Sequence, residues 1–588
     1  MHAPLLKHIR TITLAAAATC ALATPTAALA QVHIESKVDI AFNRYYSFEQ
    51  LVEFMEAFER EYPHLVKTKV IGQSYEGRDL VLVIINNEET GPDTDKPAMW
   101  IDGSIHANEI QASEVCLYTI WYLTKSHGHN AMLTDLIDRT AFYILPVVSP
   151  DSRVYWFEQP STPNTSRQNM RPVDNDRDGE FDEDPPNDLD GDGSITGMWK
   201  EDPDGRWRRS IDDPRVFERV ADDQIGGWTF LGQEGTDLDG DGRINEDGPG
   251  GDDMNRNWPA GWQPNYVQRG AGEYPLHNSE TRAIADFILS RPNIGSAQAY
   301  HNTGGMILRG PGTPERANMY PAEDLRVYNA LARTGEEMIP YYRYLIIHED
   351  LYTVHGGFVN WVAETLGIIS YTNELWTTEK YFQRDVRRPD ESRQWLWRDR
   401  LAFGELFTDF TEYDHPQYGK ILVGGPNKWS ARITPPFMLE EECHRNFAFT
   451  MYHAGEMAQL RFGRTEVHSL GDNLWSVTFE IRNERIIPTR TRQAANRRIG
   501  MPDLLTIGGD SGAVLASGTI RTWFDQQMTP LDPTGTQPGR LLIDSGIPGR
   551  GSTIFRAIVS GEPGTELTVA YSAEKAMDIS TTIRLEAD

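Results

Sequence analysis

The 588-residue chain has few cysteines, far fewer basic than acidic residues, and few long apolar runs. Three cysteines are too few for a disulfide scaffold, and because none forms a Cys-x-x-Cys pair, thiolate zinc sites and dithiol redox motifs are excluded. Against 86 Asp and Glu residues stand only 56 Lys and Arg residues, and the formal charge of −30 argues against a nucleic acid as the main partner. A metal bound by this chain must therefore be held by His, Asp and Glu.

No apolar run approaches the ~20 residues that a membrane span needs. The first residues instead carry the pattern of a targeting segment. Lys7 and Arg10 precede a short alanine-rich run, and Ala28-Leu29-Ala30 offers the small residues of a signal peptidase site. The sequence therefore predicts a signal peptide over residues 1–30, no membrane span, and export to the periplasm or the extracellular space. It carries no signal for the oligomeric state.

The chain does contain the residues of a folded core, since 15 Trp, 23 Tyr and 22 Phe exclude wholesale disorder. Helical periodicity alternates with apolar runs in its first part, which predicts a layered α/β domain over residues 31–465. The expected helices are 46–61, 108–124, 279–290, 323–338 and 438–458, and the expected strands are 80–85, 98–105, 141–148, 295–301 and 367–373. Short alternating strands between Gly, Pro and Asp turns then predict a β-sandwich over residues 466–588.

A His-x-x-Glu motif stands where one of the predicted strands passes into a helix. Three residues apart, His106 and Glu109 would project to the same side of one helical turn and could reach a single cation. Zinc accepts imidazole nitrogen and carboxylate oxygen, and it needs a third protein ligand. The same spacing recurs at His453 and Glu456 within an ordinary core helix, so spacing alone does not identify a metal site. His106 differs because it follows a buried strand, at the carboxyl end where α/β sheets place their ligands.

Further polar residues stand at the ends of other predicted strands. His301 ends the apolar run GSAQAYH, and Glu374 ends IISYTNEL. The alternative interpretation of Glu374 is a salt bridge that caps the sheet edge. Asn255 and Arg256 lie side by side in a polar loop, where the arginine could fork onto a carboxylate.

These residues and their surroundings resemble the zinc metallocarboxypeptidases of the carboxypeptidase A type. The likeness runs in order through YYSFEQLVEFMEAFEREYPHLVKTKVIGQSYEGRDLVLVIIN, GSIHANE, SPD, DMNRNW, SETRAIADFI, AYHN, LYTVHGGFVNW and YTNELW, and it spans about residues 42–410. It implies a mixed-sheet α/β/α catalytic domain that hydrolyses peptide or protein substrates.

The resemblance also implies the catalytic residues. One zinc ion would be bound by His106, Glu109 and His301. Glu374 matches the general base and acid, which would take a proton from water as the water attacks the scissile carbonyl. The oxyanion-stabilising arginine should lie in SRQNMR, where Arg171 is favoured over Arg167.

The resemblance also implies which residues bind the C-terminus of the substrate. Asn255 and Arg256 match the pair that binds the terminal carboxylate, with Tyr352 closing over it. Val359 matches the position that reads the C-terminal residue, and its apolar side chain predicts neutral or hydrophobic residues there. Asn108 stands where many relatives have an arginine, which puts the outer subsites in doubt.

Two other functions stay open at this point. The same zinc site could act on bacterial cell-wall peptides, because the Asn255-Arg256 pair fits either substrate. The chain could also be a calcium-dependent binding protein without catalysis that uses the sandwich. The complete set of implied catalytic residues argues against the second.

An acidic insertion over residues 172–253 separates the two halves of the α/β pattern. Residues 174–253 hold 26 acidic and 8 basic residues, which is 18 of the 30 excess negative charges. Three DxDxDG repeats lie in it, and alternate carboxylates on one side of a tight loop are typical of calcium loops. The repeated aspartates are Asp174, Asp176 and Asp178, then Asp188, Asp190 and Asp192, then Asp237, Asp239 and Asp241. None of the loops has a Glu at position twelve, and the alternative is a solvated acidic linker. We expect structural calcium here beside one catalytic zinc.

Overall fold

The computed structural model describes residues 34–586, except 176, 384–390, 510–511, 532 and 535–536 and the side chains of 391–394 and 396–397. The predicted signal peptide and Asp176 lie outside the described residues.

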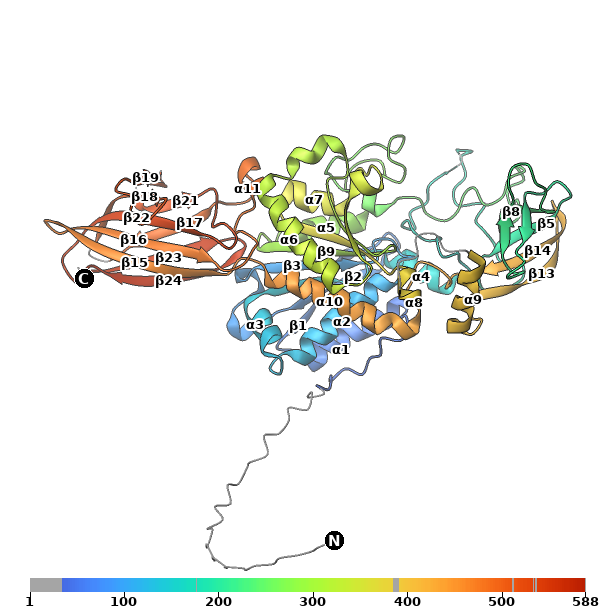
Figure 1. Cartoon of the computed structure of the whole chain (residues 1–588), viewed down its shortest axis with the longest axis horizontal. Coiled ribbons are helices and arrows are strands. Elements are labelled where there is room, and N and C mark those ends of the chain that lie inside the picture. Colours follow the sequence, from blue (N-terminus) through green and yellow to red (C-terminus); the bar gives the residue numbers. More distant parts are fainter. Residues whose placement is uncertain are drawn as a thin grey trace, which may run out of the picture. The chain divides into compact units, whose positions relative to one another are not determined.

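A mixed eight-stranded sheet forms the centre of the α/β part (Figure 1). In spatial order its strands are β1 (Val66–Gln73), β2 (Asp79–Ile85), β4 (Ala141–Leu145), β3 (Ala98–Gly103), β9 (Ile294–Asn302), β12 (Ile369–Leu375), β10 (Met306–Arg309) and β11 (Arg343–Ile346). The central strands β4, β3, β9 and β12 are parallel to one another, whereas β1–β2, β2–β4 and β12–β10 are antiparallel pairs. The predicted mixed-sheet α/β class is confirmed.

Helices cover both faces of this sheet because successive side chains of the buried strands point to opposite sides. In β3, Met99 and Ile101 pack into one apolar core and Ala98 and Trp100 into another. The first core includes residues of α1 (Phe48–Glu61), α2 (Gln111–Ser126), α3 (Ala131–Arg139), α6 (Ala322–Met338) and α10 (Leu439–Gly455). The second includes residues of α5 (Ser279–Leu289) and α7 (Phe358–Leu366). All five expected helices are present, with ends shifted by a few residues.

The two cysteines among the described residues are free thiols. Cys116 of α2 and Cys443 of α10 are both buried in the first core, where burial raises the pKa of each thiol well above its usual value. They contribute apolar packing rather than a cross-link.

The acidic insertion contains strands that its composition did not predict. Together with a later hairpin they form a six-stranded sheet in the order β13 (Phe407–His415), β14 (Gly419–Pro426), β5 (Gly197–Glu201), β8 (Trp228–Gln233), β6 (Trp207–Arg209) and β7 (Phe217–Arg219). Aromatic rings stabilise it, since Trp199 stacks on Phe217 with 3.9 Å between ring centroids. Between β4 and β5 runs α4 (Pro150–Glu158), and before β13 stand α8 (Glu379–Phe382) and α9 (Glu391–Ala402).

Two five-stranded antiparallel sheets follow, as expected for a β-sandwich. The first has the order β15 (Leu460–Gly471), β16 (Leu474–Asn483), β22 (Ser552–Ser560), β18 (Ala513–Ile520) and β19 (Thr529–Pro530). The second has the order β20 (Pro533–Thr534), β21 (Gln537–Ile543), β17 (Asp503–Gly508), β23 (Glu566–Ala573) and β24 (Ala576–Arg584), and α11 (Arg492–Arg497) stands between β16 and β17. One apolar core, which includes Phe479, Phe555 and Tyr571, is shared by both sheets.

Candidate active site

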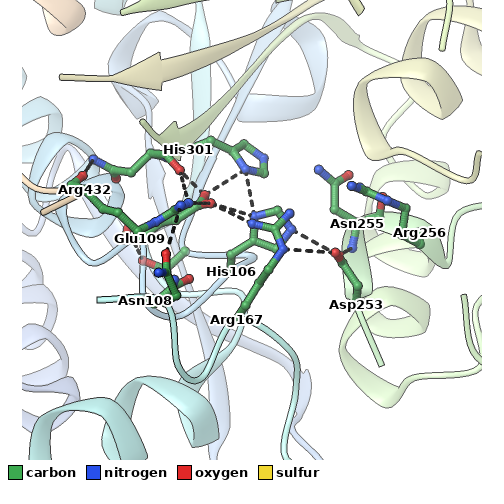
Figure 2. A network of polar contacts seen from close by, with 12 residues as sticks. His106, Asn108, Glu109, Arg167, Asp253, Asn255, Arg256, His301 and Arg432 are labelled. Atoms are coloured by element: carbon green, nitrogen blue, oxygen red, sulfur yellow. Dashed lines mark hydrogen bonds and ion pairs between the residues drawn. The ribbon is translucent and has the colours of Figure 1, made fainter. Parts of the chain in front are cut away.

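Three potential metal ligands converge at the carboxyl ends of β3 and β9 (Figure 2). His106 and Glu109 follow β3, and His301 is the penultimate residue of β9. Helix α2 begins only at Gln111, so the expected helical turn is a tight turn in front of the helix, in which the Glu109 N–H donates to the His106 carbonyl (3.2 Å). The turn still brings both side chains to one point.

The geometry of these three side chains fits a cation between them. The Nδ1 atoms of His106 and His301 lie 3.0 and 2.9 Å from the two Glu109 carboxylate oxygens, and 3.2 Å from each other. All three residues are buried, and although burial opposes ionisation, the two imidazoles lower the pKa of Glu109 well below its usual range. Two imidazole nitrogens and one carboxylate are the donor set of a catalytic zinc site, which leaves further positions open to water and substrate.

Asp253 orients His106 from the side opposite to Glu109. Its Oδ1 accepts a hydrogen bond from His106 Nε2 (3.0 Å), so that the Nδ1 lone pair points towards the other ligands. Burial opposes the charge of this carboxyl, yet Arg256, His106 and Arg167 hold its pKa well below the usual range. The sequence analysis did not assign Asp253 a role, although it precedes the Asn-Arg pair in DMNRNW.

Arg167, and not Arg171, lies against this centre. Its Nη1 is 3.1 Å from Glu109 and its Nε is 3.3 Å from Asp253, and its side chain lines the cavity beside the ligands. Arg171 is not among the residues that line the cavity, and its backbone N–H donates to Asn169 Oδ1. The position in the cavity thus favours Arg167 over Arg171 for the predicted oxyanion role, which itself stays a prediction.

A second arginine, Arg432, reaches the centre from the loop after β14. Its Nη2 donates to Glu109 (3.1 Å) and to the Asn302 carbonyl (2.7 Å), and it also lines the cavity. Asn108 at the expected arginine position instead donates to the Pro163 carbonyl (3.1 Å). Arg432 was missed because no sequence motif surrounds it.

Glu374 faces the same cavity from β12. In the parallel register of β12 and β9 it lies directly opposite His301. Burial and the nearby Glu109 carboxylate raise the pKa of Glu374 to about 7. Among the described residues Glu374 forms no salt bridge, so the alternative of a sheet-edge ion pair gains no support there.

The predicted substrate residues lie farther along the cavity, which has a volume of about 500 Å³. Asn255 accepts a hydrogen bond from the Phe358 N–H (2.9 Å), which leaves its amide group for a ligand, and Arg256 beside it is only 8% exposed. Tyr352 is 58% exposed and lines the cavity, while Val359 is buried in its wall. That wall is apolar and comprises Met306, Leu308, Ile347, Val354 and Val359.

The second His-x-x-Glu motif forms no metal centre. His453 is completely buried within α10 and packs edge-on against Tyr371, with 5.3 Å between ring centroids. Neither of its ring nitrogens has a hydrogen-bond partner among the described residues. Burial lowers the pKa of His453 to about 3. It is a neutral core residue, as its helical context predicted.

The acidic repeats lie apart from the cavity lining. Ligand atoms gather in four small groups within the insertion: Asp178, Glu183 and Asp239; Asp184, Asp239 and Glu246; Asp188, Asp190 and Glu234; Asp237, Asp239 and Asp241. Asp174 and Asp192 bind backbone N–H groups of their own loops.

In the part of the chain that the structure describes, no helix combines the length and the apolarity that crossing a bilayer requires.

Comparison with known proteins agrees with this arrangement. The model of the family described as zinc carboxypeptidase matches residues 51–196 and 229–392, more than half of the chain, and a domain of unknown function matches residues 459–584. Carboxypeptidase D of Rattus norvegicus is 31% identical over 145 residues, 25% of this chain and 10% of that protein. Carboxypeptidase B2 of Rattus norvegicus is 25% identical over 357 residues, 58% of this chain and 65% of that protein. The chain thus covers less than two thirds of either relative.

Among solved structures, the carboxypeptidase A from Helicoverpa armigera aligns with 71% of this chain and 74% of its own at 17% identity and a TM-score of 0.44. The matched family model brackets every residue of the candidate metal centre. The chain belongs to the zinc carboxypeptidase family.

Proposed function

We propose that this protein is an exported, zinc-dependent carboxypeptidase that removes a neutral or hydrophobic C-terminal residue from peptides. One observation carries the proposal: a single cavity is lined by His106 and Glu109 of the metal centre, by Glu374, by Arg256 and by an apolar wall. These are the parts that removal of one terminal residue requires. Export rests on the signal-peptide pattern of residues 1–30.

The chain's own residues supply the proton transfer and the charge stabilisation. A zinc ion held by His106, Glu109 and His301 would supply Lewis acidity to the scissile carbonyl and to water. Glu374 would accept the proton of the attacking water and return it to the leaving amine, for which a pKa near neutrality is well suited. The Arg167 guanidinium faces the centre and would stabilise the developing oxyanion, an effect worth roughly 3–4 kcal/mol for one good donor.

Arg256 makes the proposed enzyme an exopeptidase. Its guanidinium is nearly buried and would pair with a terminal carboxylate, together with the free amide group of Asn255. An internal peptide bond has no such charge, so its binding would desolvate the Arg256 guanidinium without supplying a carboxylate from the substrate, which is costly. Tyr352 is exposed at the cavity and placed to cover a bound residue.

The apolar wall supports the preference for neutral or hydrophobic residues. Leu308, Val354 and Val359 are buried there and form one apolar cluster. Among the described residues that line the cavity, the acidic ones are Glu109 and Glu374, both at the metal centre. A Lys or Arg side chain would therefore lose its hydration without gaining a partner.

The test is to replace Glu374 by Gln, with the exposed Glu337→Gln variant as control. We expect Glu374→Gln to retain one zinc per chain by elemental analysis but to lose ~10²–10⁴-fold in kcat, because only the proton acceptor is removed. Glu337→Gln should match the wild type in both. Undiminished turnover by Glu374→Gln would remove it from the role of base.

A further inference from the structure

The first and third acidic repeats are equivalent over more than their DxDxDG cores. Residues 174–184 read DNDRDGEFDED and residues 237–247 read DLDGDGRINED. Both have Gly at position six with positive φ, Gly179 at 104° and Gly242 at 97°, which is the conformation that glycine allows. Both then have an apolar residue at position eight and Glu-Asp at positions ten and eleven. The second repeat continues as SITGM and lacks that Glu-Asp pair.

The two equivalent loops are joined to each other in the structure. An isolated antiparallel bridge pairs Asp184 with Asp247, the eleventh residue of each loop, and the Asp184 N–H donates to the Asp247 carbonyl (3.2 Å). Both oxygens of Asp184 accept backbone N–H groups of the third repeat, from Leu238 (3.2 Å) and Asn245 (2.9 Å). In the opposite direction, Asn175 of the first repeat donates to Asp247 Oδ1 (2.8 Å).

Each loop's Glu faces the other loop's Asp. The Glu183 carboxyl lies against that of Asp247, and the Glu246 carboxyl against that of Asp184; desolvation and the facing acid raise the pKa of both glutamates to about 7. Ligand oxygens of Asp184, Asp239 and Glu246 lie within 4.8 Å of one another, as do those of Asp178, Glu183 and Asp239. Ionised carboxylates in such proximity repel one another, and a bound cation would relieve that repulsion.

Buried oxygens without a hydrogen-bond partner point to the same place. Asp247 is completely buried, yet its Oδ2, the oxygen not bonded to Asn175, has no hydrogen-bond partner among the described residues. Both carboxylate oxygens of Glu183 and of Glu246 are likewise covered and without a hydrogen bond. Native proteins rarely leave such groups unsatisfied, and an ion is one accepted reason for finding them.

We infer that the first and third repeats form a paired calcium site. One ion would be held by Asp178, Glu183 and Asp247, and the other by Asp239, Glu246 and Asp184, so that each ion takes the eleventh-position aspartate of the other loop. Carboxylate and carbonyl oxygens at this density suit Ca²⁺, which takes 6–8 oxygen ligands in a flexible arrangement. Mg²⁺ requires near-octahedral geometry and retains most of its water, so it fits this dense acidic set less well.

The exchange of aspartates explains why neither loop has a Glu at position twelve, since the partner loop completes the ligand set. The second repeat shows the contrast. It has no Glu-Asp pair at positions ten and eleven, so it has no aspartate to exchange in this way. The proposed pair excludes this repeat.

The paired site would hold together both ends of the insertion. On one side the chain enters through Arg167 and Asn169, and on the other it leaves through Asp252 and Asp253, with the Asn169 N–H bonded to the Asp252 carbonyl (3.0 Å). Arg167 and Asp253 both contact the candidate zinc ligands. Calcium bound between the repeats would thereby fix the spacing of two groups in the active site.

The test counts calcium bound per full-length chain after equilibrium dialysis against CaCl₂, with zinc content measured in parallel. Four variants are compared: Glu183→Gln, Asp247→Asn, Glu246→Gln, and the exposed control Asp223→Asn. Each of the first three should lose one calcium ion relative to the wild type and to the control, while zinc is retained.

Two double variants then test the exchange. Glu183→Gln with Asp247→Asn should lose only one ion, because both residues serve the same site. Glu183→Gln with Glu246→Gln should lose two. Loss of two ions in the first pair would overturn the exchange, and calcium binding unchanged by Glu183→Gln and Glu246→Gln would overturn the paired site itself. The carboxyls of Glu183 and Glu246 accept no hydrogen bond from the described residues, so these variants remain informative if Asp247→Asn does not fold. A failed zinc or peptidase assay would leave the calcium count unaffected, so the two proposals fail separately.

Discussion

At the scale of single residues, Glu109 connects the histidines and the arginines of the candidate active site. Its carboxylate contacts His106 and His301 on one side and the guanidinium groups of Arg167 and Arg432 on the other. A carboxylate with cationic neighbours stays ionised despite complete burial, which a metal ligand requires. Position 108 supplies no arginine, and Arg432 brings a positive charge to Glu109 from a distant part of the chain.

Replacing Arg432 by Gln should therefore weaken catalysis without unfolding the protein. We expect kcat/KM to fall ~10–100-fold, the usual cost of losing a group that supports a metal ligand. The control is Arg461→Gln, which removes an exposed arginine paired with Glu484 on the sandwich. Steady-state kinetics with a dipeptide substrate measure the effect, and equal kcat/KM in the two variants would show that Arg432 has no influence on the centre.

The buried imidazole of His453 should make the folded state sensitive to acid. Folded His453 stays neutral down to about pH 3, whereas in the unfolded chain it takes up a proton below about 6.5. Its neutral form thus contributes stability that is complete above pH 6.5 and is lost as the pH falls, by ~1.4 kcal/mol per pH unit. Between pH 6.5 and pH 5, the unfolding free energy of the wild type should therefore fall by about 2 kcal/mol more than that of the His453→Leu variant. Denaturant unfolding at both pH values checks this; identical pH dependence would mean that His453 is solvated or protonated in the folded state.

At the scale of elements, the junction of β3 and α2 determines the geometry of the metal ligands. Gly103 ends β3, and a Cβ at this position would lie 2.7 Å from the Ala112 carbonyl oxygen of α2. The strand and the helix can approach so closely only because residue 103 lacks a side chain. This contact holds the turn that carries His106 and Glu109 against the sheet.

The variant Gly103→Ala should consequently destabilise the α/β domain by about 1–3 kcal/mol, because the contacted atom is backbone and cannot move alone. As α2 shifts, Glu109 shifts with it, so zinc should dissociate faster on dialysis. Gly508→Ala serves as control, because a Cβ there meets nothing within 4 Å. Thermal unfolding and zinc retention equal to those of the control would contradict the role given to Gly103.

The elements that carry the family motifs were predictable from the sequence, and the others were not. Strands β3, β9 and β12 are buried and largely apolar, and His301 and Glu374 stand near the carboxyl ends of β9 and β12, so the strand type and the position of these two residues followed directly. Strands β6 and β7 are three residues long and partly charged, and β5 pairs with β14 from a distant part of the chain, so no local pattern indicated that sheet. The sequence could not show which of Arg167 and Arg171 lines the cavity for a similar reason, because both stand at the start of the insertion.

At the scale of the whole molecule, the excess of acidic residues is concentrated in the insertion. The α/β part holds the candidate metal centre and the cavity, the insertion gathers carboxylates around its own loops, and the sandwich forms a separate apolar core. Repeats at residues 174–184 and 237–247 were visible in the sequence, but their pairing through Asp184 and Asp247 was not, because equivalent loops need not contact each other.

The most direct test of the proposed function compares two peptides that differ only at the C-terminus. The mature protein is given a peptide ending in Phe with a free carboxylate and the same peptide as an amide, with and without a zinc chelator. We predict release of Phe from the free peptide alone, loss of this activity on chelation, and its recovery when zinc is restored, because Arg256 needs a carboxylate and the three ligands need their metal. Equal cleavage of the amide, or no cleavage of either peptide by protein shown to hold one zinc, would contradict the assignment as a carboxypeptidase.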